Sequence, residues 1–258
     1  MKALKCTLFI ALTMLLFPMQ NFAQDSEKNL MYRVHEDQVK LSMVSEYEAV
    51  VKELIGLMKK HSIPDTHWIT LASNDSKYRF ISPIKGMADL DKSSFITTLT
   101  EKEGEETISG LFDRMDKCYD TELDYILWLD NSLTYMPEGF TQTPEGMNYR
   151  RNHMLYVSPG NRKAVNESMK AVKATFEKIG SKEYYRVYRS GFGAEGEFYM
   201  VAIAYKDQVD QAQKSKANNA LMGEEDKKVF DKLFQNLLKY EVVEGWMRPD
   251  LGYSSKKN

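Results

Sequence analysis

Cysteine is nearly absent from this 258-residue chain, which has only Cys6 and Cys118. Cys6 falls within residues 1–23, where two lysines precede a short apolar run, the pattern of a secretory signal peptide cleaved near Ala23. Cleavage leaves Cys118 alone, so no intrachain disulfide framework can hold the mature fold. Stability must therefore come from a hydrophobic core, which a chain of this length can build.

Long hydrophobic runs and a dominant charge are also absent. No later segment carries the ~20 apolar residues that a membrane helix needs. The net charge is −2 for the whole chain; without residues 1–23, which hold two of the 35 basic residues, 33 basic residues face 37 acidic ones, a net charge of −4. The basic residues are dispersed, unlike those of a nucleic-acid-binding surface. We expect an exported protein, periplasmic or extracellular, with no nucleic-acid partner and no membrane span.

Signature motifs of common enzymes are missing as well. The sequence contains no nucleophile elbow, no P-loop, no H-E-x-x-H motif and no paired cysteines. Gly191-x-Gly193-x-x-Gly196 matches a dinucleotide-binding pattern in its letters, but a strand-like segment, 197–205, follows where a phosphate-binding helix should begin. We expect a hairpin there, no metal site, and no cofactor that a motif identifies.

What the sequence does contain is an internal repeat at an offset of 118 residues. The matching pairs gather at charged, aromatic and turn positions: Arg33 with Arg151, His35 with His153, Phe80 with Phe198, Asp89 with Asp207, Phe112 with Phe230, and Trp128 with Trp246. One ungapped offset over most of the chain indicates two copies of one unit. We predict units at 30–135 and 148–253, a linker at 136–147 rich in proline and glycine, and a polar tail at 254–258.

Each copy predicts the same order of elements, β-α-β-β-α-β, from its hydrophobic periodicity and turn residues. In the first copy the predicted elements are a strand at 30–41, a helix at 44–61, a hairpin of strands 66–72 and 78–84, a polar helical stretch at 89–99, a helix from 105 and a last strand containing Trp128. In the second copy they are a strand at 149–157, a helix after 158–159, a hairpin of strands 184–190 and 197–205, a polar helix at 207–221, a helix from 224 and a last strand containing Trp246.

This order of elements is the ferredoxin-like motif, and two such sheets in one chain can cover each other. The pattern, spread over nearly all of the mature chain, resembles the dimeric α/β-barrel superfamily. The resemblance implies an α+β fold, with two tandem ferredoxin-like units packed sheet to sheet as an intrachain pseudo-dimeric α/β barrel. Members of the superfamily include cofactor-independent monooxygenases, haem-handling enzymes and proteins without known activity, so the resemblance leaves activity, haem and oligomeric state open.

The strongest candidate site residues recur at the repeat offset. Arg33-x-His35 and Arg151-x-His153 each place an arginine and a histidine on one face of a strand. A neutral imidazole beside a fixed cation could act in acid–base chemistry or bind an anionic ligand. The alternative is a pair of partly buried residues that only form hydrogen bonds within the fold.

The two tryptophans form a second candidate. Trp128 and Trp246, with tyrosines in adjacent strands, could line an aromatic cavity for a flat organic ligand. Aromatic residues in strands also serve simply as core or interface packing.

From these features we expect a non-catalytic binding or structural protein with any small-molecule pocket in or beside the barrel. Two alternatives stay open. One is a cofactor-independent monooxygenase or a haem-binding or haem-degrading enzyme that uses His35 or His153, which requires one of these histidines to face an enclosed space. The other is a protein-interaction module, which requires a large uncovered apolar surface.

Overall fold

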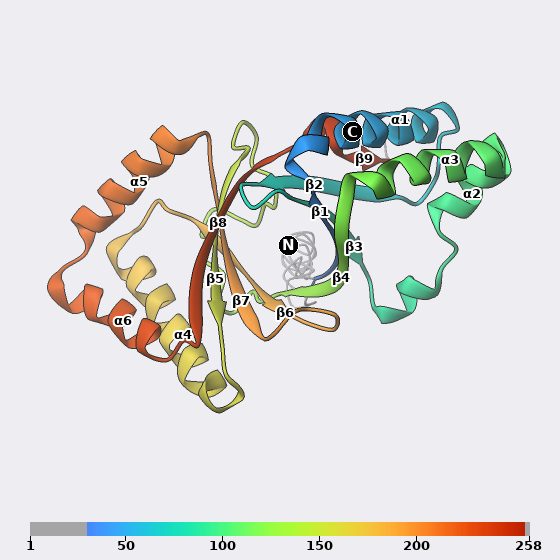
Figure 1. The fold of residues 1–258 in the computed structure, drawn as a ribbon. Helices are drawn as coiled ribbons and strands as arrows, with labels where there is room; N and C mark the ends of the chain where they lie inside the picture. Colours follow the sequence, from blue (N-terminus) through green and yellow to red (C-terminus); the bar gives the residue numbers. More distant parts are fainter. Residues whose placement is uncertain (1–29, 256–258) are drawn as a thin grey trace, which may run out of the picture.

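The computed structural model describes residues 30–255 and consists of a central β-barrel with three helices on each of two sides (Figure 1). The predicted signal peptide, 1–23, lies outside the described residues. Within 30–255, no helix is long and apolar enough to cross a membrane.

Eight antiparallel strands form one closed sheet. They are β1 (Met31–Val39), β2 (His67–Ser73), β3 (Lys77–Ile84), β4 (Tyr119–Leu129), β5 (Tyr149–Tyr156), β6 (Tyr185–Ser190), β7 (Phe198–Tyr205) and β8 (Lys239–Met247). The order around the barrel is β3-β1-β4-β6-β7-β5-β8-β2, and pairing of β2 with β3 closes it. A short strand, β9 (Tyr253–Ser254), pairs with the start of β2. The predicted α+β class and α/β barrel are therefore confirmed.

The two halves of the chain contribute matching sets of strands. The first half gives the order β4-β1-β3-β2 and the second half β8-β5-β7-β6. Short ladders join the halves, 127–129 of β4 with 188–190 of β6 and 71–73 of β2 with 245–247 of β8. The two sheets expected to face each other are thus parts of one continuous barrel.

The helices lie outside the barrel, and each set covers the strands of its own half (Figure 1). The first set is α1 (Val44–Lys60), α2 (Phe95–Glu103) and α3 (Glu105–Met115), and the second is α4 (Arg162–Ile179), α5 (Gln208–Leu221) and α6 (Glu224–Gln235). Tyr47, Val50, Val51, Leu54, Ile55 and Met58 form the buried stripe of α1 at helical spacing. The helix α4 ends at Gly180, whose φ of 61° is the left-handed conformation that favours glycine.

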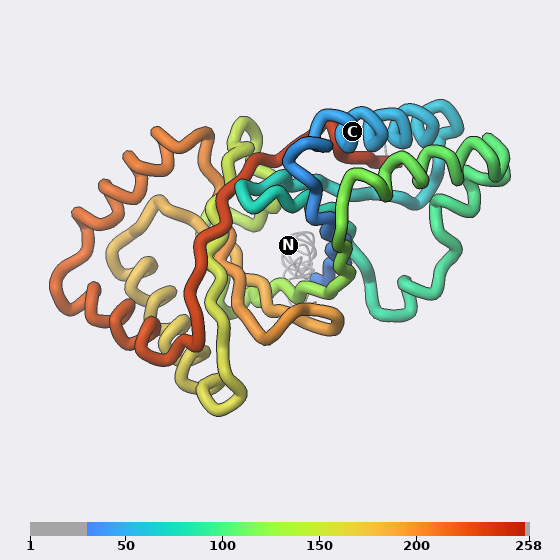
Figure 2. The backbone as a smooth tube through the Cα atoms, viewed as in Figure 1, coloured from blue at the N-terminus to red at the C-terminus, as the bar shows by residue number. Residues whose placement is uncertain are grey.

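Three hydrophobic clusters result. One lies between the first helices and the outer face of the first-half strands, a second lies at the corresponding place in the second half, and a third fills part of the barrel interior. The traced backbone shows the helices of the first half on one side of the barrel and those of the second half on the other (Figure 2). The strands are therefore buried on both faces, which is why their sequences lack a clean apolar–polar alternation.

Candidate functional site

Alternation along the strands decides which side chains enter the barrel. On β1, Tyr32, Val34 and Glu36 line the interior, whereas the residues between them point outward. On β5, Arg150 and Asn152 line the interior in the same way. The predicted Arg-x-His pairs occupy the intervening positions and so lie on the outer face.

The barrel interior contains two neighbouring chambers. The inner chamber encloses about 60 Å³ and the outer chamber about 450 Å³. Arg79, Tyr125, Asn152 and Met200 border both chambers, so the two chambers adjoin. The outer volume falls in the range of small-molecule sites, whereas the inner one has room for a few waters or a single polar group.

The arginine between the chambers is neutralised by carboxylates. Arg79 Nε donates to Glu36 Oε2 at 2.7 Å, and its Nη2 lies 3.1 Å from Asp75 Oδ2. Lys77 Nζ lies 2.6 Å from the other oxygen of Glu36. The positive charges of Arg79 and Lys77 in this part of the interior are therefore paired with carboxylates.

Two other interior arginines, Arg150 and Arg186, have no such partner. They are 4% and 3% exposed, and no carboxylate of the described residues forms an ion pair with either. Their guanidiniums donate only to backbone carbonyls, including those of Thr141 and Gln142 in the predicted linker, at 3.0 and 2.6 Å from Arg186 Nη1. Burial, and then the charge of Arg186, lower the pKa of Arg150 to about 9, and burial also lowers the pKa of Arg186. The inner chamber thus carries buried positive charge that no acidic side chain offsets.

Two buried polar atoms beside these arginines have no hydrogen-bond partner among the described residues. They are Arg186 Nε and Asn152 Oδ1. Tyr32 and Tyr188 stand beside them in an edge-to-face pair, 5.8 Å between ring centres. Burial raises the pKa of both phenols, so both stay protonated near neutral pH. Buried polar groups left unpaired are uncommon in native proteins and mark a place where a ligand or water can bind.

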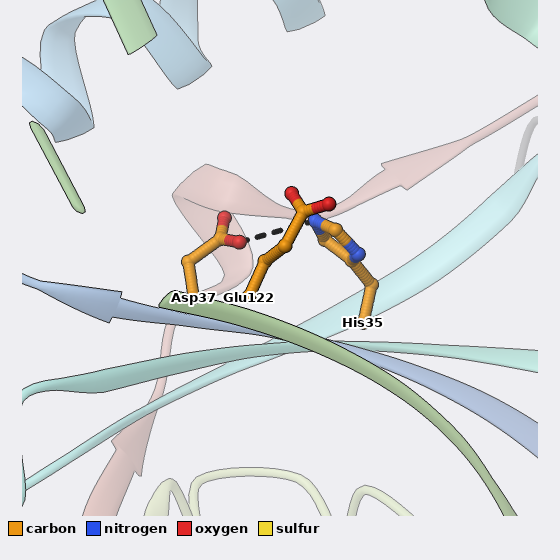
Figure 3. A group of neighbouring side chains, drawn as sticks. All are labelled: His35, Asp37 and Glu122. Carbon is orange, nitrogen blue, oxygen red and sulfur yellow. Dashed lines mark ion pairs between the residues drawn. The ribbon is translucent and has the colours of Figure 1, made fainter. Parts of the chain in front are cut away.

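The structure places the predicted histidines away from these chambers. His35 lies on the outer face with its Nε2 3.2 Å from Asp37 Oδ1 and its Nδ1 3.4 Å from Asp124 Oδ1 (Figure 3). His153 Nδ1 lies 2.6 Å from the Tyr240 hydroxyl, and the two rings stack. Neither histidine borders either chamber.

The other predicted site residues are also on the outer face. Arg33 pairs with Asp124 at 2.9 Å, and Arg151 pairs with Glu244 at 2.6 Å. Trp128 packs so tightly against Gly191 that a Cβ at that glycine would lie 2.7 Å from Trp128 Nε1. Trp246 is 45% exposed and packs on Tyr149 with 5.1 Å between ring centres. The structure therefore does not bring the six predicted residues together into one pocket.

Comparison with known proteins identifies the fold. No protein-family model and no curated protein matches the sequence. Among solved structures, an anthrone oxidase-like protein is 12% identical with a TM-score of 0.58, over 90% of this chain and 95% of that chain. A monooxygenase-like protein from Lactobacillus acidophilus is 10% identical with a TM-score of 0.51, over 88% and 97%. Chlorite dismutase from Candidatus Nitrospira defluvii is 11% identical with a TM-score of 0.49, over 86% and 93%. This chain therefore shares the dimeric α/β-barrel fold of these structures.

These structures correct one expectation. A non-catalytic binding or structural protein was the expected function, but the similar structures of this fold include an oxidase-like and a monooxygenase-like protein, which favour the enzyme alternative. The enzyme alternative also needs a correction, because neither histidine faces the enclosed space. Arginine, tyrosine and asparagine side chains line it instead.

The two chambers offer haem no histidine or cysteine ligand from the described residues. Haem iron is held in most proteins by histidine or a cysteine thiolate, and no histidine or cysteine between residues 30 and 255 borders either chamber. We therefore assign no chemical step to haem in this barrel.

Proposed function

We propose that this protein is a monooxygenase-type enzyme that oxidises a small, flat, acidic organic molecule inside the barrel. The observation that carries the proposal is the pair of buried guanidiniums of Arg150 and Arg186 at the inner end of a cavity, where no residue from 30 to 255 supplies an anionic partner. The anionic oxygen of the substrate occupies the inner chamber, and its flat body extends into the outer chamber, where charged and apolar side chains are mixed.

Electrostatics supports an oxyanion as the group that binds there. A phenolate, enolate or carboxylate would supply the missing negative charge, and Arg186 Nε would donate to it. Positive charge in a low-dielectric site stabilises the ionised form of a bound acid and lowers its pKa. Two guanidiniums therefore help to generate a reactive phenolate or enolate at neutral pH, without a dedicated side-chain base.

Such an anion can react with dioxygen by using its own electrons. A CH₂ group that is conjugated to a carbonyl, directly or through aromatic rings, loses a proton to water and gives an enolate. The enolate carbon then forms a bond to O₂, and the peroxide anion takes up a proton from water. The resulting hydroperoxide breaks its O–O bond and releases water, which leaves a new carbonyl. The substrate loses two hydrogen atoms and gains one oxygen atom, and the second oxygen atom leaves in water. The protein binds and orients the anion and excludes bulk water.

Anthrone is the probe that tests this proposal, because it carries such a CH₂ group. We expect the full chain to accelerate oxygen consumption by anthrone, with formation of anthraquinone. Substitutions Arg150→Gln and Arg186→Gln should each reduce kcat/KM by about 100-fold or more, the usual cost of losing one oxyanion-stabilising donor. The matched control is Arg189→Gln on β6, the strand of Arg186, since Arg189 pairs with Asp130 and does not border the chambers. A rate equal to that of buffer, or equal losses in all three variants, would contradict the proposal.

A non-reactive analogue gives an independent readout. Anthraquinone-2-carboxylate should bind the chain, and its affinity should fall as the pH rises above about 9, because Arg150 then loses its proton. Isothermal titration calorimetry at pH 7 and pH 10 measures this change. An affinity that does not depend on pH would show that the guanidinium pair does not hold the anion.

We also propose that the two halves are tandem ferredoxin-like units and that the chain is exported. The matching strand orders of the halves support the first proposal. The composition of residues 1–23 supports the second.

A further inference from the structure

A second polar cluster lies on the outer face of the first half, away from the barrel interior. His35 and Asp37 are two residues apart on β1, and Glu122 and Asp124 are two residues apart on β4. The register places His35 opposite Asp124 and Asp37 opposite Glu122, so the four side chains occupy the corners of one patch. Figure 3 shows the side chains of His35, Asp37 and Glu122 converging above the sheet.

The three labelled side chains have the composition and spacing of metal ligands. One ligand atom from each of His35, Asp37 and Glu122 lies within 4.8 Å of the others. An imidazole with two carboxylates is a donor set suited to zinc and other divalent transition metals.

Unpaired buried atoms point to a ligand at this place. Asp37 is 1% exposed, and its Oδ2 accepts a hydrogen bond from the Tyr47 hydroxyl. Its Oδ1 is aimed at His35 but accepts no hydrogen bond, since the 3.2 Å contact with Nε2 has an ion-pair distance without hydrogen-bond geometry. His35 Nδ1 likewise has no hydrogen-bond partner in the part of the chain that the structure describes, and only an ion-pair contact with Asp124 Oδ1 at 3.4 Å. A buried carboxylate oxygen without a donor is costly unless something else satisfies it.

We propose that His35 Nε2, Asp37 Oδ1 and the Glu122 carboxylate bind a divalent transition-metal ion, with water completing its coordination. The charges of two carboxylates and one neutral imidazole balance a divalent ion.

The surrounding residues can hold and orient the three proposed ligands. Asp124 Oδ1, 3.4 Å from His35 Nδ1, is placed to accept the Nδ1 proton of a metal-bound imidazole. Tyr47 holds Asp37, and the Tyr119 hydroxyl lies 3.3 Å from Glu122 Oε2. Zinc binds an unprotonated imidazole nitrogen, so the metal ion and a proton compete for His35 Nε2.

The site is independent of the proposed oxidation inside the barrel. His35 and Asp37 point outward, whereas their neighbours Val34 and Glu36 border the chambers. A metal here would cross-link β1 to β4.

Zinc binding to the full chain tests this proposal. After treatment with EDTA and removal of the chelator, isothermal titration calorimetry with ZnCl₂ should show one site per chain, absent with MgCl₂ or CaCl₂. Co²⁺ in place of zinc should give visible absorption bands. Affinity should decrease as the pH falls from 7 to 5, because protons then compete with zinc for the imidazole and the carboxylates.

Variants assign the site to these residues. Asp37→Asn and His35→Asn should weaken zinc binding by about 100-fold, at least the loss seen when even outer-shell partners are removed. Glu122→Gln, at an exposed position that does not threaten folding, should weaken it by more than about 10-fold. His153→Asn is the matched control and should leave binding unchanged. The proposal fails if zinc shows no saturable binding, or if Glu122→Gln binds zinc as the unaltered chain does.

Discussion

His35 and His153 occupy equivalent positions in the two halves, yet their surroundings are opposite. Asp37 and Glu122, which lie beside His35, correspond at the 118-residue offset to Leu155 and Tyr240 beside His153. Burial lowers the pKa of His35, but its ion pairs with Asp124 and Asp37 outweigh burial and raise the pKa to about 10. The same fold position therefore holds a cation in one half.

In the other half the imidazole is neutral. Burial, and then the charge of Arg151, lower the pKa of His153 to about 4. Val242 stands opposite His153 where Asp124 stands opposite His35. The comparison teaches that recurrence of a residue at the repeat offset preserves its place in the fold but not its chemistry, which its neighbours determine.

The largest effect is expected when His153 in the second half is given an acidic neighbour. Leu155 is 3% exposed and belongs to the second hydrophobic cluster. Leu155→Asp should lower the free energy of unfolding by about 3–5 kcal/mol, since it removes apolar packing and buries a carboxylate. In the folded fraction the pKa of His153 should rise above its value of about 4. Chemical denaturation and NMR titration of the imidazole measure the two effects.

The control for this change is Leu155→Asn, which has a similar shape to aspartate but no charge. It should destabilise the chain without raising the pKa of His153. An unchanged pKa in Leu155→Asp would mean that the contrast between the halves does not come from the acidic neighbours.

The sequence predicted the fold more fully than the site. The predicted 118-residue repeat led to the α/β barrel because it implied the same order of strands and helices in each half, and the structure has that order. It also favoured Arg33, His35, Arg151 and His153, which recur but lie on the outer face. Alternation shows that two residues share a face, but when both faces of a strand are buried it does not show which face lies inside the barrel.

The interior residues were missed for a related reason. Arg150 and Arg186 correspond at the repeat offset to Tyr32 and Trp68, so a search for recurring residues passes over them. An isolated arginine in a strand sequence is ordinarily a surface residue. Only the closed barrel shows that both are enclosed without a carboxylate, and strand pairing between the halves creates that enclosure.

The second-largest effect is expected in the pH dependence of the free energy of unfolding, to which His35 and His153 should contribute in opposite directions. The pKa of His35 is about 10 in the folded chain and 6.5 ordinarily, so its stabilisation is complete below pH 6.5 and is lost as the pH rises to 10. The pKa of His153 is about 4 when folded, so its stabilisation is present above pH 6.5 and is lost as the pH falls to 4. Each slope is at most about 1.4 kcal/mol per pH unit.

Urea denaturation at several pH values measures these slopes. His35→Asn should flatten the loss of stability between pH 6.5 and 10, and His153→Asn should flatten the loss between pH 6.5 and 4. EDTA must be present throughout, because a bound metal ion would change the titration of His35. Each variant serves as the control for the other. If His35→Asn instead flattened the loss of stability at low pH, or His153→Asn the loss at high pH, the pKa directions assigned to the two histidines would be wrong.

The smallest effect is expected from the two arginines that precede the histidines. Arg33 and Asp124 are 48% and 47% exposed at the side chain, whereas Arg151 and Glu244 are 29% and 27% exposed. Water screens the first pair more strongly, so Arg33→Gln should change the free energy of unfolding by less than about 0.5 kcal/mol and Arg151→Gln by up to about 1 kcal/mol. Double-mutant cycles with Asp124→Asn and Glu244→Gln isolate each pair energy. Because Asp124 also contacts His35, its cycle should be run at pH 7 in EDTA, where that imidazole stays protonated in the folded chain. A larger pair energy for Arg33 than for Arg151 would show that the carboxylates around His35 hold Arg33 in place despite its exposure. The electrostatic difference between the two halves would then include the arginines as well as the histidines.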